Sequence, residues 1–176
     1  MEYDIAFVGN TYGDHPLYAE RRRLLALLSE RYKVRVEQGV YFRNMADVYA
    51  SARVVFNRSA CGDLNMRVFE AMCAGRPLVT DAVPGLLDLF EDCKHLFVYR
   101  NDDELSRIAT PLNEFTWCER DDGDCENCAC YCDCPESADG ILLMELGWIG
   151  EAGREEVLAH HTYLHRVQTI LQAVGL

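Results

Sequence analysis

The sequence has little of three features that would define a class of protein directly: an excess of basic residues, a long apolar segment and a start that resembles a leader. Its 17 lysines and arginines stand against 29 acidic residues, a formal net charge of −12, which argues against nucleic acid or anionic membranes as partners. No stretch approaches the roughly 20 apolar residues of a membrane-spanning helix. The N-terminus has neither a basic stretch nor an apolar run of signal length. We therefore expect a cytoplasmic protein without a transmembrane segment.

Short apolar runs alternate along the chain with longer segments whose apolar residues recur at helical spacing. With 49% hydrophobic residues, the 176-residue chain can bury a core and fits one domain. We predict a single α/β domain over residues 1–176, with a Rossmann-like parallel sheet of about five strands and flanking helices. The predicted strands span 5–8, 33–36, 54–56, 78–80 and 96–99. The predicted helices span 17–31, 45–51, 63–75, 84–91, 102–109, 142–160 and 162–173.

Three predicted loops lie at the edge of the sheet where a ligand is expected. Ligands of open parallel sheets bind beyond the carboxyl ends of the strands, where helix N-termini also point. The loops at this edge are the first loop (9–14), the second loop (57–63) and the third loop (80–85). The first loop contains glycine but matches neither a GxGxxG motif nor a P-loop, so alone it is weak evidence for a ligand.

The predicted helix 63–75 carries the most informative polar face. At 100° per residue, Asp63, Arg67 and Glu70 lie on one side of it, and Asp63 can cap its N-terminus. A guanidinium beside a helix N-terminus suits a phosphate or diphosphate, because bidentate donors and free backbone N–H groups converge there. The Glu70 carboxylate, further along, can accept hydrogen bonds from both hydroxyls of a ribose. An ion pair between Arg67 and Glu70 on a solvated face is the alternative.

The segment from Asn57 to Asp81 resembles a known family. Its central run, Phe69-Glu70-Ala71-Met72-Cys73-Ala74-Gly75, and the later run Glu151-Ala152-Gly153-Arg154 are similar to the glycosyltransferase-like domain named after the spore-maturation protein CgeB. That family is similar to GT-B glycosyltransferases, in which two Rossmann-like domains face each other across a cleft. The resemblance implies that this chain is the half that binds the nucleotide-sugar donor. A separate N-terminal glycosyltransferase domain or subunit is the implied partner.

The donor site that the resemblance implies takes residues from all three loops and from the predicted helix 63–75. Its expected members are Gly9, Asn10, Thr11, Asn57, Asn65, Arg67, Glu70 and Asp81. Glu70 matches the glutamate that binds the donor ribose and Arg67 a position near the phosphates, so these two are the candidate catalytic residues. Arg21 or Arg22 is expected to add a cation beside the first loop.

One position departs from the pattern of the wider transferase family. That pattern usually carries an acidic residue eight positions before the ribose glutamate, where this chain has Gly62, with Asp63 beside it. The carboxylate that handles the sugar is therefore unassigned. The resemblance implies retaining, metal-independent transfer from a nucleotide diphosphate sugar, with Arg67 stabilising the leaving diphosphate and no cofactor required. A non-catalytic nucleotide-binding or scaffold module is the alternative function.

Nine cysteines are many for a cytoplasmic protein, and six of them fall in the acidic segment 117–139, which we interpret as an inserted loop. Its C-x-x-C pair has the spacing of a zinc chelate, and the tighter C-x-C steps resemble a thiolate trap for Zn²⁺ or Cu⁺. The candidate metal ligands are Cys125, Cys128, Cys130, Cys132 and Cys134. Transient disulfides and a poorly structured loop are the alternatives, and metal storage or redox sensing is a third possible function. Cys73, on an apolar helical face, is expected in the core.

Overall fold

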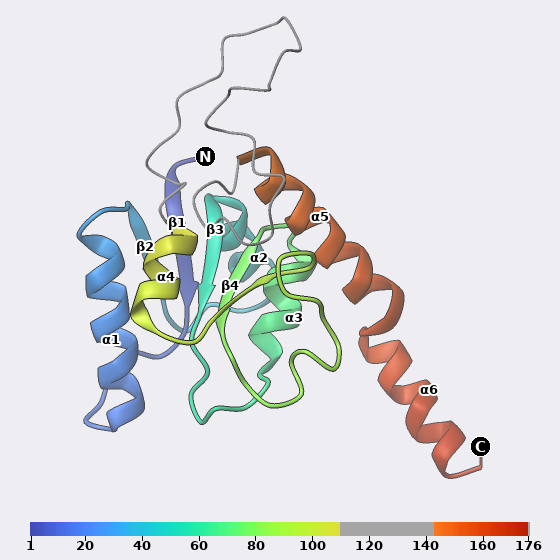
Figure 1. Cartoon of the computed structure of the whole chain (residues 1–176). Coiled ribbons are helices and arrows are strands. Elements are labelled where there is room, and N and C mark those ends of the chain that lie inside the picture. Colours follow the sequence, from blue (N-terminus) through green and yellow to red (C-terminus); the bar gives the residue numbers. More distant parts are fainter. Residues whose placement is uncertain (110–142, 176) are drawn as a thin grey trace, which may run out of the picture.

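Five parallel strands form the centre of the molecule (Figure 1). In the computed structural model, which describes residues 1–109 and 143–175, the strands lie in the order β2-β1-β3-β4-β5. They are β1 (Tyr3–Val8), β2 (Val34–Glu37), β3 (Ala52–Asn57), β4 (Leu78–Asp81) and β5 (Phe97–Tyr99). The order changes direction between β1 and β3, and ligands of such sheets bind beyond the strand ends at that point. The predicted α/β fold is confirmed.

Helices cover both faces of this sheet. They are α1 (Pro16–Ser29), α2 (Phe42–Ala50), α3 (Met66–Cys73), α4 (Asp102–Ala109), α5 (Leu143–His160) and α6 (Tyr163–Ala173). α1 and α4 pack on one face through Leu24, Leu28 and Leu105, and α2 and α3 pack on the other through Val48 and Val68. None of the helices in the described ranges is long and apolar enough to cross a membrane.

One predicted helix is wrong. Residues 84–91 form a succession of turns, in which the Leu86 N–H donates to the Val83 carbonyl and the Phe90 N–H to the Leu86 carbonyl. Gly85 has a φ of +80°, a left-handed conformation that a right-handed helix does not contain. Leu86 and Phe90 are nevertheless buried in the core. The apolar spacing of this segment therefore reflects the packing of turns against the sheet.

Helix α5 contacts the backbone of the domain directly, through two glycines. A Cβ added at Gly153 would lie 2.3 Å from the carbonyl oxygen of His95 and 3.0 Å from Met72 Cε. A Cβ added at Gly150 would lie 2.8 Å from the carbonyl oxygen of Gly75. A side chain at either position would force α5 away from the loops beside α3 and β5. The two glycines thus set how closely α5 docks.

The joint between α5 and α6 is built around His161. Its imidazole packs against Phe69 and Phe90, with ring centroids 6.0 and 5.1 Å away. Burial lowers the pKa of His161, so the packed ring is favoured in its neutral form. The N–H of Thr162 donates to Nδ1 of His165 at 3.2 Å and so caps the start of α6. The joint fixes the direction in which α6 leaves the domain.

α6 projects away from the rest of the domain (Figure 1), and none of its residues is buried. Its large apolar side chains recur at helical spacing on one face and remain 40–74% exposed. These residues, together with the one that follows the helix, form the α6 stripe: Tyr163, Leu164, Val167, Ile170, Leu171 and Val174. Exposed apolar surfaces of this kind are typical of interaction sites.

Candidate functional site

The carboxyl ends of β1, β3 and β4 bring the three loops together at one edge of the sheet. Arg21 on α1 ties the first loop to the second. The residue is 3% exposed, and its Nη1 donates to the carbonyl oxygen of Asn10 at 3.0 Å. Its Nε and Nη2 donate to the carbonyl oxygen of Arg58 at 3.0 and 2.7 Å. Arg21, one of the two expected cationic partners of the ligand, is therefore turned toward the protein and joins the loops.

Asp81 at the end of β4 joins the third loop to the second. The residue is 2% exposed, and its carboxylate accepts hydrogen bonds from the Ser59 N–H at 2.8 Å and from the Ser59 hydroxyl. It also forms an ion pair with Arg58 at 2.7 Å. Beside it, the amide of Asn57 donates to the hydroxyl of Thr80 at 2.9 Å. The structure thus places Asn57 and Asp81, both predicted to bind the donor, in buried supporting positions.

The first loop is anchored from two sides. Gln38, which follows β2, accepts a hydrogen bond from the Thr11 N–H at 3.2 Å and donates to the Thr11 hydroxyl at 2.8 Å. Arg22, the other expected cation, donates to the carbonyl oxygen of Thr11. Gly9 lies against the ring of Phe7, where an added Cβ would be only 2.8 Å from the ring. The N–H of Thr11, an expected member of the donor site, is therefore already bonded within the protein.

The N-terminus of α3 lies at the second loop. Its N-cap is Asn65, whose side chain accepts a hydrogen bond from the Arg67 N–H at 3.1 Å. The predicted cap, Asp63, is wrong, because this residue precedes the cap and lies exposed in the loop. Nε of Arg67 is buried without a hydrogen-bond partner among the described residues, and no ion pair joins Arg67 to Glu70 there. The alternative of a solvated ion pair is therefore not what the structure shows.

Arg21, Arg58 and Arg67 all belong to the segments that meet at this edge of the sheet. Burial and then the repulsion of Arg67 lower the pKa of Arg21, and Tyr18 and Asp81 act in the opposite direction. Asp81 offsets part of the positive charge through its ion pair with Arg58. The net charge of the whole protein is −12. A guanidinium at the start of a helix, such as that of Arg67, can attract an anion locally against this overall field.

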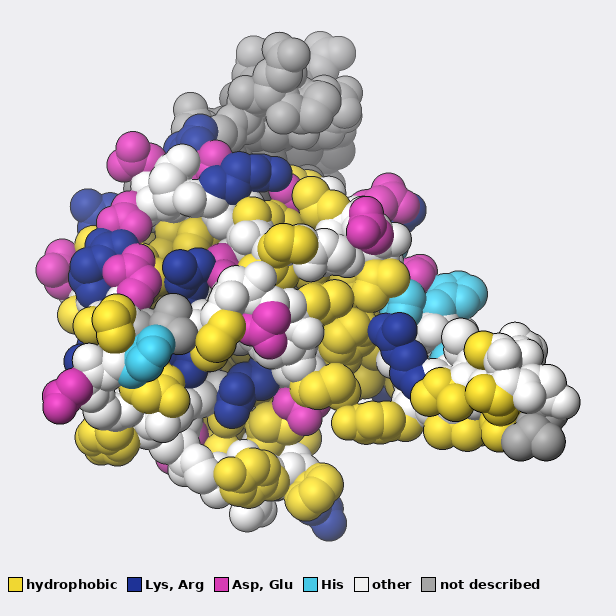
Figure 2. All heavy atoms as spheres, turned by 90° about the horizontal axis from the view of Figure 1, so that it is seen from below, with side chains coloured by type: hydrophobic (Ala, Val, Ile, Leu, Met, Phe, Trp, Pro, Cys, Tyr) yellow, Lys and Arg dark blue, Asp and Glu magenta, His cyan; other side chains and the backbone are white. Residues whose placement is uncertain are grey.

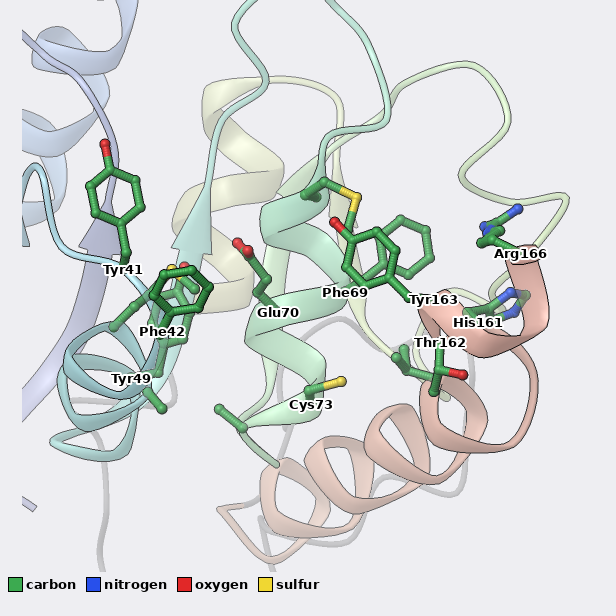
Figure 3. A pocket seen from close by; sticks show the side chains of 15 residues that line it. Tyr41, Phe42, Tyr49, Phe69, Glu70, Cys73, His161, Thr162, Tyr163 and Arg166 are labelled. Atoms are coloured by element: carbon green, nitrogen blue, oxygen red, sulfur yellow. The ribbon is translucent and has the colours of Figure 1, made fainter. Parts of the chain in front are cut away.

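A groove of about 470 Å³ lies between α2, α3 and the start of α6 (Figure 3). Its wall is mostly aromatic and apolar, and Glu70 provides its carboxylate. The labelled lining residues are Tyr41, Phe42, Tyr49, Phe69, Glu70, Cys73, His161, Thr162, Tyr163 and Arg166. Arg67 does not line the groove, although it is one turn away from Glu70 on the same helix. The two candidate catalytic residues therefore face two neighbouring compartments of the site: Arg67 the sheet edge and Glu70 the groove.

Two features of the groove differ from the sequence prediction. Cys73 is exposed at the groove wall and not in the core, and partial burial raises the pKa of its thiol. Tyr41 and Phe42 were not among the predicted site residues, yet they are 67% and 90% exposed. Phe42 has a φ of +52°, a costly conformation for a bulky residue that functional sites often retain. An aromatic pair at the start of a helix that follows a strand is the signal that would have indicated them.

The cysteine-rich segment 117–139, with the five candidate metal ligands, lies outside the described residues. Within residues 1–109 and 143–175, no group of three or more His, Cys, Asp or Glu side chains is arranged to hold a metal ion. The three cysteines of those ranges are the free thiols Cys61, Cys73 and Cys93. Burial raises the pKa of Cys93 to about 11, which makes it a poor nucleophile. The metal-binding insert stays a prediction.

Comparison with known proteins decides the family. A family model described as glycosyl transferase-like matches residues 1–116. The chain belongs to this glycosyl transferase-like family. A search of curated proteins gives no significant match. Among solved structures, Anabaena Alr3699/HepE, crystallised in complex with UDP-glucose, is 15% identical with a TM-score of 0.61. Sucrose-phosphate synthase from Thermosynechococcus elongatus is 19% identical with a TM-score of 0.57.

This glycosyl transferase-like chain aligns with those two structures over 97% and 99% of its own residues. It spans only 40% of the HepE chain and 46% of the sucrose-phosphate synthase chain. The likeness confirms that the chain has the fold of half a GT-B glycosyltransferase. At these identities it extends to the fold alone, and roles of individual residues stay predictions.

Proposed function

We propose that this chain is the donor-binding half of a GT-B glycosyltransferase, which transfers a sugar from a nucleotide diphosphate sugar to an acceptor. One observation carries the proposal: α3 presents Arg67, whose Nε has no partner among the described residues, at the sheet edge and Glu70 in an aromatic groove. A ligand that fits both compartments joins an anion to a flat, amphipathic ring system. A nucleotide diphosphate has this composition, and HepE was crystallised with UDP-glucose.

The diphosphate would bind where α3 begins. The first N–H groups of a helix have no intrahelical partners, and the helix dipole favours an anion at this end. Arg67 adds a guanidinium whose planar fork can bind phosphate oxygens in a bidentate manner. Arg58 also lies at this edge, but its ion pair with Asp81 already engages it. Arg67 is therefore the principal candidate for the phosphate contact.

The nucleoside would occupy the groove. The Glu70 carboxylate can accept hydrogen bonds from both ribose hydroxyls, which is the role that the family resemblance gives it. Tyr41 and Phe42 at the groove rim present exposed rings on which a base can stack. Arg166 of α6 lies 5.8 Å from the Phe69 ring at the opposite wall. The groove thus offers a few polar groups, with Glu70 as its carboxylate, in a mostly apolar wall, as nucleoside sites require.

In the transfer step, the bond between the anomeric carbon of the sugar and the diphosphate breaks, and negative charge develops on the leaving oxygen. Arg67 would stabilise this charge more strongly in the transition state than in the ground state, which is the condition for catalysis. The acceptor and its general base would come from a facing domain. Retention of anomeric configuration and independence from metal are inferred from the family resemblance alone.

Calorimetric titration with UDP-, GDP-, ADP- and dTDP-sugars tests the donor site. We expect one donor to bind saturably, and Arg67→Ala to weaken its affinity about 10- to 100-fold, because a hydrogen bond to a charged group contributes roughly 1.5–3 kcal/mol. Glu70→Ala should lower the affinity for the same donor, because the contacts to the ribose are lost. Both variants should leave the unfolding temperature close to that of the wild type.

Arg107→Ala and Glu155→Ala are the matched controls for this titration. Both side chains are exposed, and neither lines the groove. They remove the same two types of charge from the protein, so general electrostatic effects on an anionic ligand should appear in them as well. If folded wild-type protein binds none of the donors, the assignment of the donor site is wrong.

A non-catalytic nucleotide-binding module is the second candidate, and one observation favours it. Gly62, exposed with a φ of +68°, occupies the position where the wider family has a carboxylate to handle the sugar. The neighbouring Asp63 carboxylate accepts a hydrogen bond from the Cys61 N–H at 3.3 Å, within the loop. A nucleotide-sugar that binds but stays intact even when a facing domain is present would favour this candidate over a transferase.

We also propose that a facing α/β domain, on the same polypeptide or on another, docks on the α6 stripe. Tyr163 belongs both to the groove wall and to the stripe, so a domain packed on the stripe would also border the groove. Figure 2 shows hydrophobic side chains of α6 on the face that also carries the carboxyl edge of the sheet. The two solved structures have more than half of their length beyond the part matched here. The stripe contains no charged residue, which suits burial.

Sedimentation velocity and binding of the hydrophobic dye bis-ANS test this docking surface. We expect the isolated chain to stay monomeric and to bind the dye at the exposed stripe. The double substitution Val167→Glu/Ile170→Glu should remove most of the dye signal, whereas Gln168→Glu/Thr169→Glu, outside the stripe, should keep it. A concentration-dependent dimer that only the first pair abolishes would contradict a facing domain and assign the stripe to a second copy.

A further inference from the structure

The surroundings of Arg21 determine what its side chain can do. Its guanidinium carbon lies 5.8 Å from the centroid of the Phe7 ring and 6.0 Å from that of Tyr18. Three of its N–H donors are used, one on the carbonyl oxygen of Asn10 and two on that of Arg58. A guanidinium is planar and directs its donors in fixed directions. One buried side chain therefore holds backbone groups of the first and second loops at the same time.

Each of these contacts fixes a whole peptide plane. In a trans peptide, the C=O of one residue and the N–H of the next point in opposite directions. With the Asn10 carbonyl turned toward Arg21, the following N–H points away and donates to Gln38 at 3.2 Å. With the Arg58 carbonyl turned the same way, the following N–H donates to Asp81 at 2.8 Å. The orientation of both loops thus depends on Arg21 from one side and on an acceptor side chain from the other.

We infer that Arg21 is a positioning residue that locks the first and second loops into one unit, against which the diphosphate of the donor binds. The ligand in this inference rests on the proposed function, but the lock itself does not. At 3% exposure Arg21 acts through the backbone of Asn10 and Arg58 and does not contact the ligand. A lysine in its place would keep the charge but has no planar fork to hold two carbonyl oxygens.

Hydrogen exchange of the unliganded protein, followed by mass spectrometry, tests the lock. In Arg21→Lys we expect peptides that cover 9–14 and 57–63 to exchange faster together, by about tenfold, as the loss of hydrogen bonds to two carbonyls implies. Peptides from α5 should keep their wild-type rates. Arg23→Lys on the same helix is the matched control, because Arg23 pairs with Glu20 and Asp102 on the surface and should leave both loops unchanged.

Calorimetry with inorganic pyrophosphate, a nucleoside diphosphate and the corresponding nucleoside separates positioning from general destabilisation. Arg21→Lys should lower the affinity for pyrophosphate and for the nucleoside diphosphate about tenfold. The affinity for the nucleoside, which binds in the groove, should stay within about twofold of the wild-type value. Arg21→Gln is a second variant, because its shorter amide releases both carbonyls without leaving a buried charge.

The outcomes separate the lock from the proposed function. Faster exchange throughout the chain, faster exchange in one loop only, or wild-type affinity for pyrophosphate in both variants would overturn the inference. If the wild-type protein binds neither pyrophosphate nor any nucleotide, the proposed function fails by itself. Joint acceleration of the two loops in Arg21→Lys would then still support the lock between them.

Discussion

Gly153→Ala should lower the free energy of unfolding by about 3 kcal/mol, at the upper end of the usual cost of overpacking a core. The added Cβ would lie 2.3 Å from the carbonyl oxygen of His95 and 3.0 Å from Met72 Cε. The methionine side chain can move aside, but the His95 carbonyl belongs to the backbone that leads into β5. α5 itself must therefore shift. Urea and thermal unfolding followed by circular dichroism would measure the loss.

Gly147 on the same helix is the matched control. No atom lies within 4 Å of a Cβ built at that position. Gly147→Ala should therefore stabilise the protein by roughly 0.5–1 kcal/mol, because alanine has the higher helix propensity. Opposite signs for the two substitutions would identify the close approach of α5 as the cause. A Gly153→Ala variant as stable as the wild type would show that α5 does not dock as described.

The fold follows from local patterns because those patterns and the packing of the domain agree. α4 spans Asp102–Ala109 as predicted, since acidic residues occupy its first turn and Leu105 faces the core. The segment 84–91 was predicted as a helix from similar spacing of apolar residues, yet it forms turns. The difference lies in the backbone of Gly85, whose left-handed conformation is not evident from the spacing of its neighbours.

The site is less predictable, because spacing along a helix identifies a shared face but not what that face meets. Arg67 and Glu70 were expected to act together, but the first lies at the sheet edge and the second in the groove. Cys73 was expected in the core and lies at the groove wall. The hydrogen bonds between Gln38 and Thr11 join two loops whose proximity depends on the order of the strands. Such contacts follow from the topology and not from a local motif.

Asp81→Asn should lower the free energy of unfolding by about 3 kcal/mol, because it removes one partner from a buried, charged hydrogen-bond network. The carboxylate receives the Ser59 N–H at 2.8 Å, the Ser59 hydroxyl and a guanidinium nitrogen of Arg58 at 2.7 Å. An asparagine would turn an amide donor toward at least one of these donors. Asp88→Asn, at an exposed turn, is the matched control and should change the stability by less than about 0.5 kcal/mol.

The same substitution separates two roles for Asp81. If Asp81 only contacts the donor, the Asp81→Asn protein should bind the donor more weakly and keep the stability of the wild type. If Asp81 supports the second loop, the Asp81→Asn protein should be less stable even without a ligand. Saturating nucleotide should then restore part of the lost stability, because it binds the folded state. The burial of Asp81 and the use of both of its oxygens favour support. Wild-type stability combined with weaker donor binding would instead make Asp81 a direct ligand contact.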